Sequence, residues 1–191
     1  AEQLFKEVKR PDEVIYNMMM NGYGKAGQMA KAEQLFDEMK QNGPRPNEVT
    51  YSTMIDGYAK AGQMTKAEQL FDEMQQKRIW PNEMIYSSMI HGYAKTGQME
   101  TAEALFEGMK QKGLCPDAVT YTTMIVGFAK AGRMNNAKEL FDEMERKKIP
   151  HNDILYSVLI DGYLATGHIE MAKTIFKASP SFRERVEPVL G

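Results

Sequence analysis

The sequence repeats itself with a period of 35 residues. Tyrosines recur at this interval, at Tyr16, Tyr51, Tyr86, Tyr121 and Tyr156, and the residues around each of them recur as well. One copy is EVTYSTMIDGYAKAGQMTKAEQLFDEM, which spans residues 48–74, and the copy around the last tyrosine diverges most. A strict period of this length is typical of solenoids, in which each unit packs mainly on its neighbours.

Each unit contains two stretches with helical periodicity. In the copy quoted above, the first apolar stripe is Tyr51, Met54, Ile55 and Tyr58, and the second is Met64, Ala67, Leu70, Phe71 and Met74. A glycine between the stripes, such as Gly62, marks the place where the first helix ends and the chain turns. A proline followed by Asn or Asp, as in Pro46 and Asn47, then closes the unit and caps the next helix.

These features predict an all-α fold, because one helical hairpin of this size cannot bury its apolar faces alone. We expect an α-solenoid whose stacked hairpins form a right-handed superhelix with a concave and a convex side. The expected complete repeats are 13–47, 48–82, 83–117 and 118–152, followed by a partial repeat at 153–178. Residues 1–12 resemble a second helix without its first helix, and residues 179–191 are expected to form a capping segment.

Composition and charge exclude several classes of protein. The formal net charge of -2 argues against a surface that is basic throughout, so any contact with nucleic acid must be local. The single cysteine, Cys115, excludes an internal disulfide and a multi-cysteine metal site. No apolar run reaches the roughly 18 residues that span a bilayer, so we expect no membrane partner. We also expect no metal and no cofactor.

The repeat resembles the pentatricopeptide repeat. The resemblance rests on V-T-Y-x-T-M-I-x-G-Y-x-K-A-G near the start of the unit and A-x-x-L-F-x-E-M near its end, and it covers nearly the whole chain in mostly 35-residue, P-type repeats. The tetratricopeptide repeat is excluded because it is one residue shorter and opens with Trp-x-x-Leu-Gly, which is absent here. The resemblance implies binding of single-stranded RNA in a mitochondrion or chloroplast, one base per repeat. It also allows other RNA-processing proteins as partners.

By this resemblance, the fifth and the last residue of each repeat contact the RNA base. The fifth residues are Asn17, Ser52, Ser87, Thr122 and Ser157, and the last residues are Asn47, Asn82, Asp117 and Asn152. The chemistry of these side chains supports such a role. A short hydroxyl leaves room for a two-ring purine, whereas an asparagine amide at the fifth position reaches a one-ring pyrimidine. At the last position aspartate only accepts hydrogen bonds, which suits guanine or uracil, and asparagine can donate to adenine or cytosine.

The pairs of base-contacting residues predict the core target 5'-(C/U)AGA-3'. Asn17 with Asn47 corresponds to C or U, Ser52 with Asn82 to A, Ser87 with Asp117 to G, and Thr122 with Asn152 to A. A further purine would lie at Ser157. The alternative is that these small polar residues are helix N-caps and turn residues, which their local chemistry also favours.

Two further sets of residues recur along the repeats. The second residues are Val14, Val49, Met84, Val119 and Ile154, which by resemblance wedge between consecutive bases; the alternative is a hydrophobic staple at the helix start. The thirteenth residues are Lys25, Lys60, Lys95 and Lys130, with Ala165 in the last unit. These lysines are expected either to contact RNA phosphates or to offset the negative ends of the first helices.

Acidic pairs occupy the second helices and are expected on the convex side. They are Asp37–Glu38, Asp72–Glu73 and Asp142–Glu143. This segregation of charge lets a chain of near-zero net charge have a local basic column.

Catalysis is not expected from this sequence. The H-x-E motif at His168 and Glu170 resembles part of a zinc deaminase site, but the partner P-C-x-x-C is absent. Three functions remain open: an RNA-binding module that acts in RNA processing, stability, editing or translation, a tetratricopeptide-like protein scaffold, and the specificity arm of an RNA-editing enzyme. A scaffold would favour larger and charged fifth residues, which are not seen. The short link at 9–12 keeps the editing alternative open.

Overall fold

A computed structural model describes residues 11–150 and 153–179 of the chain, and within them it contains ten α-helices and no strand. The first helices of the repeats are α2 (Glu13–Lys25), α4 (Glu48–Lys60), α6 (Glu83–Lys95), α8 (Ala118–Lys130) and α10 (Asp153–Ala165). The second helices are α3 (Met29–Asn42), α5 (Met64–Gln76), α7 (Met99–Gln111), α9 (Met134–Arg146) and α11 (Ile169–Ala178). Each first helix begins at the residue where the sequence predicts a repeat to begin.

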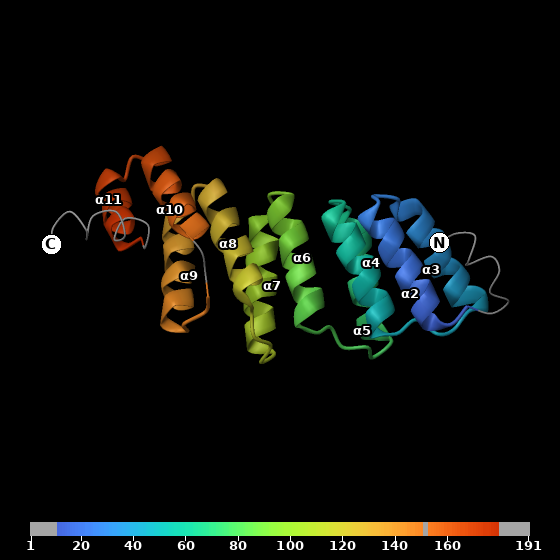
Figure 1. Ribbon diagram of the computed structural model, residues 1–191. Helices are drawn as coiled ribbons and strands as arrows, with labels where there is room; N and C mark the ends of the chain where they lie inside the picture. Colours follow the sequence, from blue (N-terminus) through green and yellow to red (C-terminus); the bar gives the residue numbers. More distant parts are fainter. Residues whose placement is uncertain (1–10, 151–152, 180–191) are drawn as a thin grey trace.

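The hairpins stack side by side along the chain (Figure 1). Each first helix packs on the first helix of the next repeat, and each of the second helices α3, α5, α7 and α9 packs on the first helix of its own repeat and of the next. One layer therefore consists of first helices and the other of second helices. The predicted α-solenoid is confirmed. Most of the expected partial repeat at 1–12 and of the capping segment at 179–191 lies outside the described residues.

The helix ends follow from local sequence signals. Asn47, Asn82 and Asp117 are N-caps with extended backbone, and their side chains accept hydrogen bonds from backbone N–H groups in the first turn. The first helices end before a glycine with positive φ, which is 72° at Gly62. Glycine adopts this left-handed conformation without the steric cost that a side chain would add. The predicted caps and turns are therefore confirmed at these positions.

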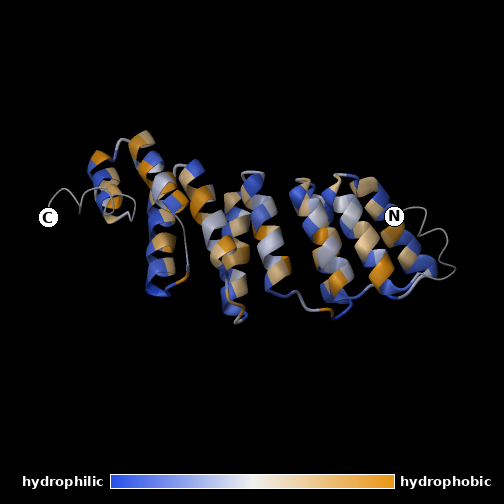
Figure 2. Ribbon diagram, in the orientation of Figure 1, coloured by the Kyte–Doolittle hydropathy of each residue, from blue (hydrophilic) through white to orange (hydrophobic). Residues whose placement is uncertain are grey.

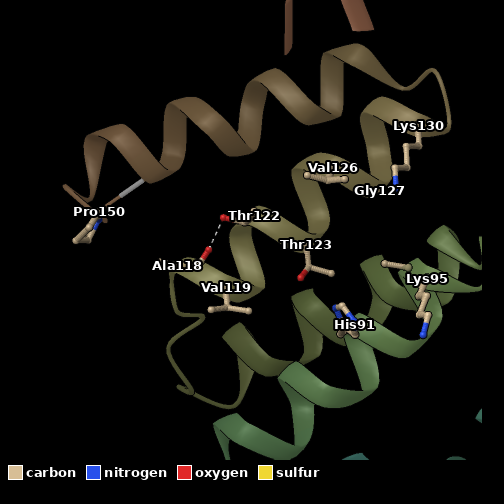
Figure 3. Close-up of a pocket in the computed structure, with 11 residues that line it drawn as sticks. His91, Lys95, Ala118, Val119, Thr122, Thr123, Val126, Gly127, Lys130 and Pro150 are labelled. Carbon is tan, nitrogen blue, oxygen red and sulfur yellow. Dashed lines mark hydrogen bonds between the residues drawn. The ribbon is translucent and has the colours of Figure 1, made fainter. Parts of the chain in front are cut away.

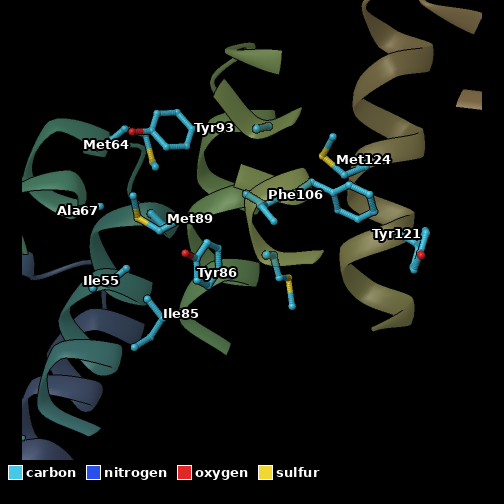
Figure 4. Close-up of a cluster of buried hydrophobic side chains, with 14 of the residues drawn as sticks. Ile55, Met64, Ala67, Ile85, Tyr86, Met89, Tyr93, Phe106, Tyr121 and Met124 are labelled. Carbon is cyan, nitrogen blue, oxygen red and sulfur yellow. The ribbon is translucent and has the colours of Figure 1, made fainter. Parts of the chain in front are cut away.

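Aromatic pairs join consecutive repeats through the core. The tyrosine that defines the period meets, edge to face, a phenylalanine from the second helix of the preceding repeat, and Figure 4 shows Phe106 of α7 beside Tyr121 of α8. The pairs are Phe36–Tyr51, Phe71–Tyr86, Phe106–Tyr121 and Phe141–Tyr156, with ring centroids 5.2 to 5.8 Å apart. Such pairs contribute about 0.5–1.5 kcal/mol beyond their burial. They stabilise the stacking of one repeat on the next.

The helices are amphipathic, with hydrophobic and hydrophilic residues alternating along each of them (Figure 2). Two of the acidic residues on the second helices, Glu143 and Glu73, form hydrogen bonds that stabilise the fold. Glu143 of α9 accepts hydrogen bonds from the Tyr121 hydroxyl at 2.8 Å and from Lys147 Nζ at 2.7 Å. Burial raises the pKa of Glu143, but the bonds from Lys147 and Tyr121 outweigh it, so the net pKa lies below its ordinary value. Glu73, Tyr51 and Lys77 form the same arrangement two repeats earlier.

Candidate nucleic-acid interface

Five exposed apolar side chains form a column on the solvent-exposed face of the first helices, which we call the first-helix face. They are the second residues of these helices, and 56% to 65% of each is exposed: Val14, Val49, Met84, Val119 and Ile154. A hydrophobic staple joins the residue before the N-cap to the fourth residue of the helix, so the second residue does not occupy its position. Repeated exposure of large apolar side chains is typical of a binding surface.

The fifth residues lie about one helical turn beyond this apolar column. Ser52 is buried, Asn17, Ser87 and Thr122 are half-buried, and Ser157 is exposed. The Thr122 hydroxyl donates to the Ala118 carbonyl oxygen at 2.7 Å, and the Ser157 hydroxyl donates to that of Asp153 at 3.3 Å. These bonds occupy the hydroxyl protons and leave oxygen lone pairs to accept a further hydrogen bond.

Asn17 differs from the other fifth residues, because its side-chain oxygen is buried and lacks a hydrogen-bond partner among the described residues. An unsatisfied buried acceptor costs roughly 1–3 kcal/mol. In this conformation the oxygen is enclosed by the protein, so it is not itself accessible to a base.

The N-cap role, one of the two roles expected for the last residues, is confirmed for Asn47, Asn82 and Asp117. Each acts as an N-cap through Oδ1, which accepts from the backbone N–H of Thr50, Ile85 or Thr120 at 3.1, 3.1 and 2.8 Å. Capping occupies only that one atom. Nδ2 of Asn47 and Oδ2 of Asp117 have no hydrogen-bond partner among the described residues, whereas Nδ2 of Asn82 donates one of its two protons to Glu48 Oε1. Asn152 lies outside the described residues.

A cavity of about 640 Å³ opens on the first-helix face between α6 and α8 (Figure 3). Its lining brings together Val119 of the apolar column, the fifth residue Thr122, and the lysines Lys95 and Lys130. Three of the predicted sets of residues thus meet in one place. The predominantly apolar lining with a few polar groups is typical of a site for a small planar ligand group.

The cavity is also lined by residues that the sequence did not single out. His91, Thr123 and Val126 line it, as does Pro150 from the segment before α10. Thr123 and Val126 follow Val119 at the spacing of a helical stripe and precede Lys130 at the same spacing. That spacing would have identified them. His91 has the same place in its helix as Val126, one repeat earlier.

The four lysines are the last residues of α2, α4, α6 and α8, and all are exposed. Lys60 forms an ion pair of 2.6 Å with Asp56, one turn earlier. Lys95 Nζ donates at 2.6 Å to the backbone carbonyl of Lys60, at the C-terminal end of α4. By this bond Lys95 offsets the negative end of α4, which is one of the two roles expected for these lysines. Lys130 makes no ion pair with any described residue and lines the cavity.

Within residues 11–150 and 153–179, no group of three or more His, Cys, Asp or Glu side chains could hold a metal ion. None of the described helices has the length and hydropathy that crossing a bilayer requires. His168, from the rejected H-x-E motif, lies 3.0 Å from Thr166 Oγ1.

Family comparison identifies the repeat. Residues 11–60, 81–130 and 116–164 match a family model described as the PPR repeat family, and residues 49–79 and 154–179 match one described as the PPR repeat. Together these matches cover most of the chain. A comparison with curated protein sequences found no match.

Solved structures give a consistent result. The pentatricopeptide repeat protein PPR10 from maize is 27% identical over 100% of this chain, with a TM-score of 0.80, and the chain covers 28% of that protein. The same protein in complex with an 18-nt psaJ RNA element is 29% identical over 96% of this chain, with a TM-score of 0.78. The PPR domain of Arabidopsis thaliana protein-only RNase P 1, in complex with tRNA, is 18% identical over 92% of this chain and 97% of that domain, with a TM-score of 0.75. This last likeness concerns the fold alone.

Proposed function

The chain belongs to the pentatricopeptide repeat family, and on that premise we propose that it binds single-stranded RNA in a sequence-specific manner. Each complete repeat contacts one base, and the core target is 5'-(C/U)AGA-3'. The observation that carries the proposal is the cavity between α6 and α8, where an exposed apolar side chain, a fifth residue and two lysines line the same space. The likeness to PPR10, which has been solved with an 18-nt RNA element, supports the same class of ligand.

The three sets of residues divide the recognition of one nucleotide. The apolar column, Val119 among its members, contacts the faces of consecutive bases, a contact worth up to roughly 1–3 kcal/mol when the side chain is aromatic and less for aliphatic ones. The lysines at the ends of the first helices attract the phosphates. The fifth and last residues form hydrogen bonds with the base edge. Binding energy and specificity therefore come from different side chains.

The capping geometry supports the assignment of bases to the last residues. Because Oδ1 of Asn47 is held by the start of α4, its amide donor Nδ2 remains for a base. A donor at this place suits the ring nitrogen acceptor of cytosine or adenine. Asp117 keeps Oδ2, an acceptor, which suits the ring N–H of guanine. Capping thus fixes which polar atom a base meets.

The proposed cellular role follows from the family alone. We place the protein in a mitochondrion or chloroplast, where it acts in the processing, stability, editing or translation of a transcript, together with other RNA-processing proteins. It contributes binding rather than catalysis.

The test is a fluorescence anisotropy titration of a labelled single-stranded RNA that contains CAGA. Permuted RNAs of the same composition serve as controls. We expect each wrong base to weaken binding by roughly tenfold, as expected for about 1.4 kcal/mol. The variant Ser87→Asn should move the preference at the third base from G to U. Equal binding of all permuted RNAs, or an unaltered preference in Ser87→Asn, would overturn the base assignment, and no binding to any RNA would favour a protein scaffold.

A further inference from the structure

A chain of three polar side chains crosses the boundary between the third and fourth complete repeats. The Ser87 hydroxyl lies 2.6 Å from Oγ1 of Thr120, and this Oγ1 donates to Oδ1 of Asp117 at 2.7 Å. Thr120 is the third residue of α8, and only 1% of it is exposed. It therefore connects the two side chains to which the third base is assigned, although it is not itself exposed to a base.

The hydroxyl protons have only one consistent arrangement in this chain. A threonine hydroxyl has a single proton, and an ionised carboxylate only accepts hydrogen bonds, so the Thr120 proton points to Asp117. The Thr120 oxygen must then accept the proton of Ser87. As a result, Ser87 presents lone pairs to the first-helix face, and Asp117 presents Oδ2. Both members of the pair are acceptors.

The preceding base site lacks this connection, because Ile85 has the place of Thr120. Ser52 there donates to the sulfur of Met84 at 3.4 Å, which is a weak acceptor. Oδ1 of Asn82 accepts from the Ile85 backbone N–H alone, and its Nδ2 donates to Glu48 Oε1. The hydrogen bond that the Ser52 hydroxyl donates is therefore weaker than the one that the Ser87 hydroxyl donates. A nucleobase at this site can accept a hydrogen bond from Ser52 instead.

We propose that Thr120 is a positioning residue that fixes Ser87 and Asp117 as acceptors and thereby sharpens selection of guanine over adenine at the third base. Guanine has two donors on its Watson–Crick edge, the ring N–H and the exocyclic amino group, whereas adenine has one donor and a ring acceptor. Two fixed acceptors suit the first pattern and oppose the second. The inference rests on the proposed function, since it concerns the same base site.

The test compares wild type with Thr120→Val on two RNAs that differ only in G or A at the third base. Valine keeps the shape of threonine and removes the hydroxyl, so the Ser87 proton becomes free to donate. We expect the preference for G over A at the third base to fall by roughly fivefold to tenfold, the size of one hydrogen bond. The preference for A over G at the second base should stay unchanged. The variant Thr120→Ser, which keeps a hydroxyl, should restore the preference for G at the third base.

A matched control is Thr50→Val. Thr50 has the same place in α4, and its hydroxyl donates to Oδ1 of Asn47 at 3.1 Å. Each valine variant loses two side-chain hydrogen bonds: Thr50→Val loses both bonds of the Thr50 hydroxyl with Asn47, and Thr120→Val loses the bonds with Asp117 and Ser87. Thermal unfolding should therefore report similar losses of stability. Only Thr120→Val should alter selection at the third base. A wild type without any preference for G would contradict the base assignment itself, whereas a wild-type preference that Thr120→Val retains in full would overturn the positioning role alone.

Discussion

The sulfur of Met29 lies 2.7 Å from the place that a Cβ atom would occupy on Gly57. Met29 begins the second helix of one repeat, and Gly57 lies inside the first helix of the next. The same relation recurs 35 residues later at each step, in the pairs Met64–Gly92, Met99–Gly127 and Met134–Gly162. A glycine inside a helix weakens it by about 0.5–1 kcal/mol, so close approach of the methionine is the reason for its presence here. Packing between repeats thus overrides helix propensity.

Gly57→Ala should therefore destabilise the protein despite the better helix propensity of alanine. The added methyl group overpacks a site where Met29 is itself buried, and the net loss should be roughly 1 kcal/mol. The matched control is Gly108→Ala in α7, where a Cβ meets no atom within 4 Å. That change should stabilise the protein by about 0.5–1 kcal/mol. Chemical denaturation measures both, and equal signs for the two variants would contradict the packing argument.

Asp117→Asn separates capping from base recognition. Asparagine caps a helix about as well as aspartate, so the melting temperature should change little. The donor Nδ2 replaces an acceptor, so the preferred third base should change from G to A in RNA titrations. Asp117→Ala should instead cost about 1 kcal/mol of stability and abolish selection at that base. An Asn variant that still prefers G would show that this side chain does not contact the base.

Val119→Ala should weaken RNA binding without affecting the fold. The side chain is 65% exposed, so its removal takes little buried surface from the folded state. If a base packs on it, affinity should fall by roughly threefold to tenfold, whatever the sequence of the RNA. Ala118 is adjacent and lines the same cavity. An unchanged dissociation constant for Val119→Ala would remove the apolar column from the interface.

Lys130→Ala should lower RNA affinity more than Lys60→Ala. Lys60 is already paired with Asp56, and part of its attraction for a phosphate is cancelled. Loss of a lysine that contacts a phosphate should reduce the slope of log affinity against log salt by about 0.7. We expect that reduction for Lys130→Ala and a smaller one for Lys60→Ala. Identical salt slopes in wild type and both variants would mean that neither lysine contacts the backbone.

Glu143→Gln tests the ionic cluster on the second-helix side. The folded-state pKa of Glu143 lies below its ordinary value of 4.5, so its contribution to stability is present above that pH and is lost as the pH falls through the lower folded value. The variant should lose roughly 1 kcal/mol at neutral pH and approach wild type as the pH falls through the lowered folded-state pKa of Glu143. Glu139→Gln, an exposed site on the same helix, should have little effect. A pH-independent difference in melting temperature would exclude ionisation as the cause.

The sequence alone was sufficient to predict the helices and their ends. Helical periodicity, the glycine after each first helix and the Asn or Asp before it are local signals, and helix starts such as Glu48 and Ala118 agree with the predicted repeat starts. The repetition made these signals reliable, because the same pattern occurs in several copies. The positions of the apolar column on exposed helix starts were also accessible from the sequence. The assignment of bases to the fifth and last residues stays a prediction.

Contacts between repeats could not be predicted in this way. The link from Ser87 through Thr120 to Asp117, the bond of Asn82 to Glu48 and the place of His91 in the cavity join residues about one repeat apart. A helix and its cap are set by residues within about four positions, through hydrogen bonds that the backbone makes with itself and its nearest side chains. Side chains on different repeats meet only where two rigid hairpins are placed at a given angle and separation, and a shift of one or two ångströms replaces one hydrogen-bond partner with another. The sequence therefore determined what the repeats are, and the stacking decided which of their polar atoms remain free for a ligand.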